Sequence, residues 1–240
     1  GSSGNNISHN NITAKGNTGG GNYGINSYDN VVAVRYNIIS FNTIRTNSGA
    51  SNGNYGIEFG GEGNPSHNNI SYNNITTSGG SGINTGNTGI FIIQGHNFSV
   101  TNNSIYASGN GARQRGIQLG NSIIVSDSDV SYNSINTSGT GENQGIYLLV
   151  SNRNNIKFNH IHTGGSSSQN YGIWAPSGSS NDNIISNSIN ATGTTNNYGI
   201  YLDGSSTSNL TSNTIITRGT SDNHGIYFLS SSTNNLTSNI

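Results

Sequence analysis

Two short phrases recur from one end of this chain to the other, and their spacing limits the folds that it can adopt. The first is a glycine followed by isoleucine, as in NYGIYL at 197–202. Its glycine returns every 26–33 residues, at Gly24, Gly56, Gly89, Gly116, Gly145, Gly172, Gly199 and Gly225. A repeat of this length is one supersecondary unit that cannot bury its own apolar face, so successive units must stack on one another.

The second phrase alternates with the first and consists of an apolar residue, two variable residues, Asn, one variable residue and Ile. Its asparagine stands at Asn10, Asn42, Asn73, Asn103, Asn133, Asn159, Asn187, Asn213 and Asn239. We interpret the phrase as two short strands that meet at a bend, where Asn supplies left-handed backbone geometry and side-chain hydrogen bonds. Because stacking places one bend above the next, we expect these amides to form an internal ladder.

Small residues follow the second phrase at fixed distances. Two places after each Ile stands Ala or Thr, which indicates a tight interior. Two places further on, seven of eight copies carry Gly, which we interpret as a turn with positive φ. Together with the alternating Ile and Leu of GIYL, the pattern predicts three short strands in each repeat. NYGIYL is then predicted to be the turn through which each coil enters its first strand.

These phrases resemble the coils of the right-handed parallel β-helix proteins of the pectate-lyase-like superfamily, in which Asn-x-Ile-x-x-Asn-x-Ile and Gly-Ile-x-Leu recur. The resemblance covers the whole chain. It implies an all-β, right-handed parallel β-helix (a solenoid) of about eight to nine coils, with three short strands per coil, in one domain over residues 1–240. The alternative fold is a leucine-rich repeat, which would place leucine-rich helical turns where this chain has Gly, Ser, Thr and a further strand.

The composition narrows the classes of partner. Hydrophobic residues make up 29% of the chain and charged residues 7%, while 45 of the 240 residues are Asn. Disordered chains of such low hydrophobicity normally carry high net charge, whereas the net charge here is −1. This balance predicts neither nucleic acid nor an anionic membrane as partner, and no apolar run approaches the length of a membrane span. The chain has no cysteine, which excludes disulfides and thiolate metal sites.

Carboxylates that meet on adjacent coils would indicate an enzyme, because members of that superfamily that act on polysaccharides need clustered acidic groups on the outer face of the first strand. Glu58 is expected to point outward, and the equivalent positions on the neighbouring coils are Asn26 and Phe91. Asp203 likewise has no acidic residue at the equivalent positions. We therefore predict no catalytic residue in this chain.

One segment is similar to a catalytic signature. YGINSYD at 23–29 resembles the Tyr-Gly-Phe/Ile-Asp-Pro-His-Asp motif of mannuronan epimerases and alginate lyases. Asn26 stands where that motif has its first Asp, and Tyr28 stands where it has His. An amide cannot act as a general base, and a phenol is a poor substitute for imidazole near neutral pH. We interpret the segment as a diverged repeat coil.

Histidine and basic residues offer little further chemistry. His160 and His162 lie two apart, and so on one face of a strand, but the sequence offers no third metal ligand. We expect both to be surface residues, and we predict no metal and no cofactor. The positive charges of RQR at 113–115, of Arg153 and of Lys157 are interpreted as belonging to solvated turns.

Aromatic residues give the most specific candidate for a binding site. The outward residue of the Gly-Ile-x strand is aromatic in the last four repeats, at Tyr147, Trp174, Tyr201 and Tyr227. An exposed aromatic column is a suitable platform for sugar rings, which makes these residues candidates for glycan binding. The alternative is a ladder of rings that stack on one another and stabilise the sheet.

The sequence thus favours a non-catalytic extracellular or cell-surface β-helical protein, such as a sheath, filament, S-layer or adhesin element. The alternatives are a carbohydrate-active β-helix and a glycan-binding module that uses the aromatic column. We expect the chain to be a segment of a longer array, because its first and last residues repeat the sequence pattern of the interior coils. Its expected partners are further coils or copies of the same chain, and a polysaccharide.

Overall fold

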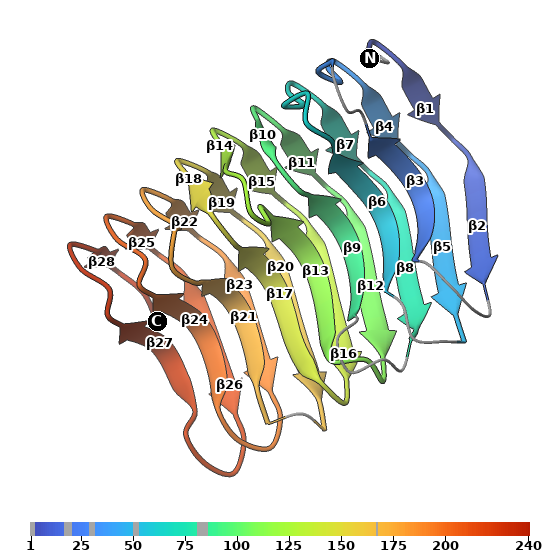
Figure 1. Ribbon diagram of the computed structural model, residues 1–240. Coiled ribbons are helices and arrows are strands. Elements are labelled where there is room, and N and C mark those ends of the chain that lie inside the picture. The colour runs from blue at the N-terminus through green and yellow to red at the C-terminus, as the bar shows by residue number, and fades with distance from the viewer. Residues whose placement is uncertain (1–2, 17–20, 29–31, 50–52, 81–85, 167) are drawn as a thin grey trace.

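The computed structural model describes residues 3–16, 21–28, 32–49, 53–80, 86–166 and 168–240. Within them every regular element is a β-strand, and all of the pairings between strands are parallel. The strands of successive coils lie side by side and form a rod of stacked coils (Figure 1). This architecture confirms the predicted all-β parallel β-helix. The described residues contain no helix long and apolar enough to cross a membrane.

Three long sheets form the sides of the rod, and each coil contributes one strand to each sheet. Sheet A contains β1 (Asn6–Ser8), β4 (Ile38–Ser40), β7 (Asn69–Ser71), β11 (Ser99–Thr101), β15 (Asp129–Ser131), β19 (Asn155–Lys157), β22 (Asn183–Ile185), β25 (Asn209–Thr211) and β28 (Asn235–Thr237). Sheet B contains β2 (Asn11–Gly16), β5 (Thr43–Ser48), β8 (Asn74–Gly79), β12 (Ser104–Gly109), β16 (Ser134–Gly139), β20 (His160–Gly165), β23 (Ser188–Thr192) and β26 (Thr214–Arg218).

Sheet C contains β3 (Asn22–Tyr28), β6 (Asn54–Gly60), β9 (Gly86–Ile92), β13 (Arg113–Leu119), β17 (Glu142–Leu148), β21 (Asn170–Ala175), β24 (Asn197–Asp203) and β27 (His224–Leu229). A short fourth sheet contains β10 (Gly95–His96), β14 (Val125–Ser126) and β18 (Ser151–Asn152). The nine strands of sheet A and the eight strands of sheets B and C agree with the predicted number of coils. The core is a continuous column of isoleucines, valines and leucines enclosed by these sheets.

The predicted asparagine ladder runs along the corner between sheets A and B. The side-chain amide of each ladder asparagine donates to the Oδ1 of the next, from Asn10 to Asn239, at 2.9–3.0 Å. The same Oδ1 accepts the backbone N–H of the preceding ladder residue, as between Asn103 and Asn133 at 3.0 Å. The second amide hydrogen of Asn133 goes to the carbonyl of Val100 at 2.8 Å. The interior members are therefore fully hydrogen-bonded although they are buried.

The bend itself differs from the prediction in one respect. The left-handed φ belongs to the residue before each ladder asparagine, as at Phe41, Tyr72 and Tyr132, with φ of 56–57°. Among the described non-glycine residues with positive φ, none is a ladder asparagine. The asparagine is required for the hydrogen bonds of its side chain, and its neighbour takes the unusual backbone conformation.

The glycine of the first phrase was predicted to form a turn, and this prediction is wrong. Gly145 lies inside β17, between Gln144 and Ile146, both of which pair with the neighbouring strand β13. A Cβ on Gly145 would overlap Cγ2 of Ile161 in sheet B and the carbonyl oxygen of Gly172 on the next coil. The phrase returns in every coil because only glycine permits sheets B and C to approach this closely.

The glycines that end the strands of sheet B have two roles. Gly79, Gly109 and Gly165 have positive φ, as predicted. Gly16, Gly139, Gly193 and Gly219 are not among the described residues with positive φ, so the prediction is wrong at these four positions. A Cβ on Gly139 would instead overlap the carbonyl oxygen of Gly109. Glycine is therefore needed at the ends of these strands for the close approach of neighbouring backbones as well as for positive φ.

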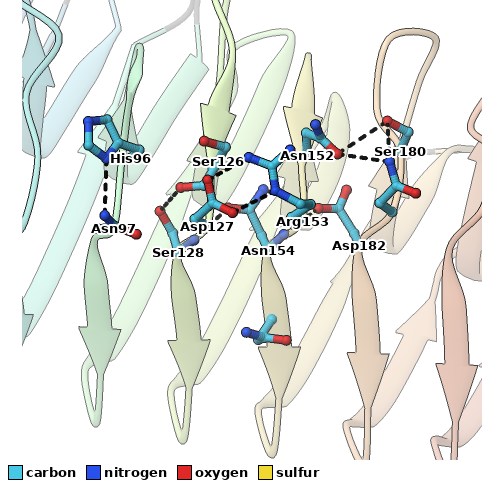
Figure 2. Close-up of polar contacts among 12 residues, drawn as sticks. His96, Asn97, Ser126, Asp127, Ser128, Asn152, Arg153, Asn154, Ser180 and Asp182 are labelled. Atoms are coloured by element: carbon cyan, nitrogen blue, oxygen red, sulfur yellow. Dashed lines mark hydrogen bonds and ion pairs between the residues drawn. The ribbon is translucent and has the colours of Figure 1, made fainter.

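Two further amide ladders occupy the other corners of the rod. One ladder lies where the strands of sheet C begin, and its side-chain amides bond from coil to coil. Its first part is formed by Asn22, Asn54, Asn87 and Gln114, and its second part by Asn143, Asn170, Asn197 and Asn223. The third corner, before sheet A, is more varied: Asn37 bonds to Asn68 at 2.9 Å, and Asn154 bonds to Asp182 at 3.1 Å. Figure 2 shows Asn154 and Asp182 on adjacent coils, beside the ion pair of Arg153 and Asp127.

The small-residue positions of the interior coils are buried as predicted, and the buried threonine hydroxyls there have no hydrogen-bond partner among the described residues. Thr77, Thr137 and Thr163 are fully buried, as is Ala107 in the same column. The Oγ1 atoms of these threonines make no hydrogen bond among the described residues. Their methyl groups fill the interior, as the 3.4 Å separation between Cγ2 of Thr163 and a Cβ placed on Gly145 illustrates. Shape, rather than hydrogen bonding, therefore decides which residues fit here.

We predict that the asparagine ladder contributes measurably to stability. Asn133→Leu should lower the free energy of unfolding by about 1–3 kcal/mol, because it removes the acceptor of two Asn103 donors and the donor to Val100. Urea unfolding followed by circular dichroism measures the change. The control is Asn136→Leu on the exposed face of β16 in the same coil, which should change stability by less than about 0.5 kcal/mol. Equal losses in the two variants would contradict the prediction.

Candidate functional site

The outer face of sheet C carries the aromatic column that the sequence indicated. Tyr147, Trp174, Tyr201 and Tyr227 occupy equivalent positions on successive strands. Their ring centroids are 5.0 Å apart from Tyr147 to Trp174, 6.1 Å from Trp174 to Tyr201 and 5.3 Å from Tyr201 to Tyr227. The four residues therefore form one contiguous column that points away from the core.

The column is less exposed than the sequence suggested. Tyr147 is only 8% exposed, and the other three rings are of intermediate exposure. The planes of Trp174 and Tyr201 are nearly parallel, at 7°, which is the arrangement of the self-stacking ladder. Rings stacked along the rod cover one another's faces and leave mainly edges and hydroxyls to the solvent.

A second aromatic column lies beside the first, and the sequence reasoning missed it. Tyr171, Tyr198 and His224 stand three residues before Trp174, Tyr201 and Tyr227 and also point outward. Tyr198 lies 5.0 Å from the ring of Tyr201 and 5.3 Å from that of Tyr171. The tyrosine of the recurring NYG phrase could have indicated this column. It was missed because strict alternation along a strand places residues three apart on opposite faces. The pairing of β21 with β24 skips Gly172 and Gly199, and the rings of Tyr198 and Tyr201, on either side of Gly199, lie on the same face, 5.0 Å apart.

Arg115 forms the polar end of the double column. Its guanidinium carbon lies 4.6 Å from the ring centroid of Tyr147. Its Nε donates to Oε1 of Gln144 at 2.8 Å, and its Nη1 donates to Oε1 of Gln118 at 2.9 Å. Burial lowers the pKa of Arg115 to about 10. Among the described residues no carboxylate forms a salt bridge with this guanidinium, because Glu142 pairs with Arg113 instead.

Glu58 lies on the same face, three coils before Tyr147. Its neighbours at the equivalent positions are Asn26 and Phe91, as the sequence indicated, so neither register position beside it carries a second carboxylate. Although Glu58 lies on the outer face as expected, only 6% of it is accessible, and burial raises its pKa to about 7. The pKa of the neighbouring Tyr55 is raised by burial and by the charge of Glu58. Glu58 is thus the carboxyl of this face that can exchange a proton near neutral pH.

The segment similar to the epimerase and lyase signature forms β3. Asn26 pairs with Glu58 on the next coil, and Tyr28 is 58% exposed at the end of the strand. Asp29, the final residue of the segment, lies outside the described residues. The described part of the segment brings no carboxylate and no imidazole to this end of sheet C.

The remaining candidates are structural. His160 is exposed and His162 is of intermediate exposure on β20, and no group of three potential metal ligands occurs in the part of the chain that the structure describes. Arg153 donates to both oxygens of Asp127, at 2.7 and 2.8 Å, and Lys157 lies 3.2 Å from Asp129. These basic residues therefore pair with acidic residues of adjacent coils instead of forming a positive patch.

One further carboxyl is buried away from sheet C. Asp182 is 1% exposed, and burial raises its pKa to about 6, although hydrogen bonds from Ser151 and Asn154 act in the opposite direction. Ser151 Oγ donates to its Oδ2 at 2.7 Å, where a ladder asparagine would instead place an amide nitrogen. Asp182 thus replaces an asparagine of the corner ladder.

Comparisons with known proteins give one structural likeness. No protein-family model matches this chain, and no curated protein matches it. The fold is similar to that of the Azotobacter vinelandii mannuronan C-5 epimerase AlgE6 A-module, with 16% sequence identity and a TM-score of 0.47. The match covers 91% of this chain and 60% of that chain.

We predict that ionisation of Glu58 destabilises the fold. Its folded pKa of about 7 lies above the ordinary value of 4.5, so the protein should lose about 1–3 kcal/mol of stability as pH rises from about 4.5 to 7. Glu58→Gln should remove this loss, because the amide does not ionise. Urea unfolding across this range measures it, with Glu62→Gln on an exposed residue as control. Identical pH profiles for the wild type and Glu58→Gln would contradict the prediction.

Proposed function

We propose that this protein is a non-catalytic β-solenoid of an extracellular or cell-surface structure, and that it binds an acidic polysaccharide along the outer face of sheet C. The observation that carries the proposal is the guanidinium of Arg115, which is held in a fixed orientation by amide oxygens and an aromatic ring. The stacked coils supply a continuous sheet along which an extended ligand of that kind can lie.

The environment of Arg115 suits a carboxylate ligand. Gln118 and Gln144 use only Nη1 and Nε of the guanidinium, and neither amide neutralises its charge. A partly buried guanidinium gains most from a partner that is both charged and planar, and a carboxylate meets both requirements. Uronic acid residues carry that group on every ring of an acidic polysaccharide.

The double aromatic column extends the same surface along the rod. Beyond Arg115 and Tyr147, the edges and hydroxyls of Trp174, Tyr198 and Tyr201 continue on successive coils, which are spaced by about 4.8 Å. A glycan that runs parallel to the rod axis would place its hydroxyls against phenols and amides, and beside Tyr201 it would also meet the carboxyl group of Asp203. The candidates Tyr147, Trp174, Tyr201 and Tyr227 thus form one part of a longer surface.

A carbohydrate-active enzyme is the second candidate function, and Glu58 is the observation that favours it. A buried carboxyl with a pKa of about 7, beside the phenol of Tyr55, has the proton affinity that general acid–base catalysis requires. The structure shows no second carboxylate beside it at the equivalent positions on the neighbouring coils. We therefore place binding ahead of catalysis.

We predict that Arg115→Gln weakens the binding of acidic polysaccharides by about 10- to 100-fold, which corresponds to the loss of a charge-assisted hydrogen bond. Calorimetry or affinity electrophoresis with polygalacturonate and alginate measures the change, with dextran as the neutral comparison. The matched control is Arg153→Gln, whose guanidinium pairs with Asp127 at another corner. Failure of the wild type to bind either acidic polymer, or equal binding by Arg115→Gln, would refute the proposal.

We further predict that the protein does not cleave or epimerise these polymers. The measurement is the appearance of reducing ends, of unsaturated products or of changed uronate composition after incubation with polygalacturonate and alginate. Activity that disappears in Glu58→Gln or Asp203→Asn, with binding retained, would establish the second candidate function in place of the first.

A further inference from the structure

Another surface, at the corner between sheets A and B, carries aromatic rings that neither the core nor sheet C uses. The residue before each ladder asparagine has a φ of 53–59° in every described coil, so the side chains at this position all project from the corner in the same direction. Several are aromatic and about half exposed: Phe41 (52%), Tyr72 (53%), Tyr132 (57%) and Phe158 (45%). We call this set the corner column.

The rings of the corner column stack where they are adjacent. Phe41 and Tyr72 are 5.0 Å apart with planes 3° from parallel, and Tyr132 and Phe158 are 5.0 Å apart with planes 14° from parallel. Between the two pairs the column is interrupted by Asn102, whose φ is 57°. The three coils remain in register there, because Thr101 pairs with Ser71 on one side and with Ser131 on the other.

One ring of the stack is missing at the interruption, and the shorter side chain of Asn102 stands in this gap. Since one coil step separates stacked rings by 5.0 Å, Tyr72 and Tyr132 lie two steps, or about 10 Å, apart. A six-membered ring midway between them would have the same spacing to each as the rings of the column have to one another. Asn102 lies exposed between Tyr72 and Tyr132, and its side chain makes no hydrogen bond with any described residue.

We propose that this gap, the ring slot, binds a neutral hexopyranose ring between Tyr72 and Tyr132, with the amide of Asn102 bonding its hydroxyls. Pyranose rings present C–H groups on their faces and hydroxyls at their edges, which matches two aromatic walls and a polar base. On the strands that flank the slot, β7, β8, β11, β12, β15 and β16, Asp129 is the one charged residue, and Lys157 pairs with it at 3.2 Å. The slot therefore offers nothing to neutralise a charged sugar.

The ring slot differs from the proposed acidic-glycan surface in both place and chemistry. Arg115 lies on sheet C, whereas the slot opens at the corner between sheets A and B. The two proposals can fail separately, because Arg115→Gln leaves the slot intact and a change at Asn102 leaves sheet C intact.

The test is to fill the slot with a ring of the protein's own. Asn102→Tyr should fold, because Tyr72 and Tyr132 adopt the same φ, and it should complete a stack of five rings from Phe41 to Phe158. Calorimetry and saturation-transfer NMR with cello-, manno- and galacto-oligosaccharides should show weak binding by the wild type. Binding should be lost, by at least about tenfold, in Asn102→Tyr. Tyr132→Ala should weaken it by about two- to tenfold through the loss of one wall.

The control is Ser212→Tyr, which adds a tyrosine to the same corner, at φ of 57°, three coils beyond Tyr132. It should bind the sugars as the wild type does. Wild-type protein that binds none of the three sugars, or Asn102→Tyr that binds them as well as the wild type, would overturn the proposal. Wild-type protein that instead dimerises through a contact abolished by Asn102→Tyr would also overturn it, because the slot would then hold a ring of a second copy.

Discussion

The amide ladder from Asn10 to Asn239 fixes how each coil sits on the next. Every rung combines a side-chain bond and a backbone bond to the same oxygen, so a coil that slipped by one residue would leave several buried donors unpaired. Two further ladders hold the remaining corners, with Asn197 and Asn154 as examples. The coils differ in length by several residues. Their corners still superpose, because these hydrogen bonds hold each coil in one register on the next.

Fixed register has a direct consequence for the surface. A residue type that recurs at one position of the repeat becomes a continuous column on the rod, whereas a substitution in one coil becomes a local site. The double aromatic column around Trp174 and Tyr201 is an example of the first. Arg115, Glu58 and Asn102 are examples of the second, because each departs from the residues above and below it. Functional chemistry in this fold is therefore expected where the repeat is broken.

The candidate site shows how far a repeat pattern predicts chemistry. The alignment of coils was sufficient to place Tyr147 beside Trp174 and to show that no carboxylate occupies the positions equivalent to Glu58 on the two neighbouring coils. It could not show that Glu58 is buried, because its burial depends on neighbouring side chains such as Tyr55 and Phe91. Nor could it show that Arg115 lies over Tyr147, since that contact depends on rotamers chosen in the folded state.

The sequence by itself determined the coil: its length, its three strands, its buried isoleucines and the asparagine at its corner. Each follows from periodicity, because every repeat must bury the same face against its neighbours. Only the tertiary structure decided what happens where two sheets meet. It placed Gly145 inside a strand against Ile161, gave the left-handed φ to Tyr72 instead of Asn73, and turned Tyr198 to the same face as Tyr201. These outcomes depend on contacts between segments far apart in the chain, which a pattern read along one strand does not contain.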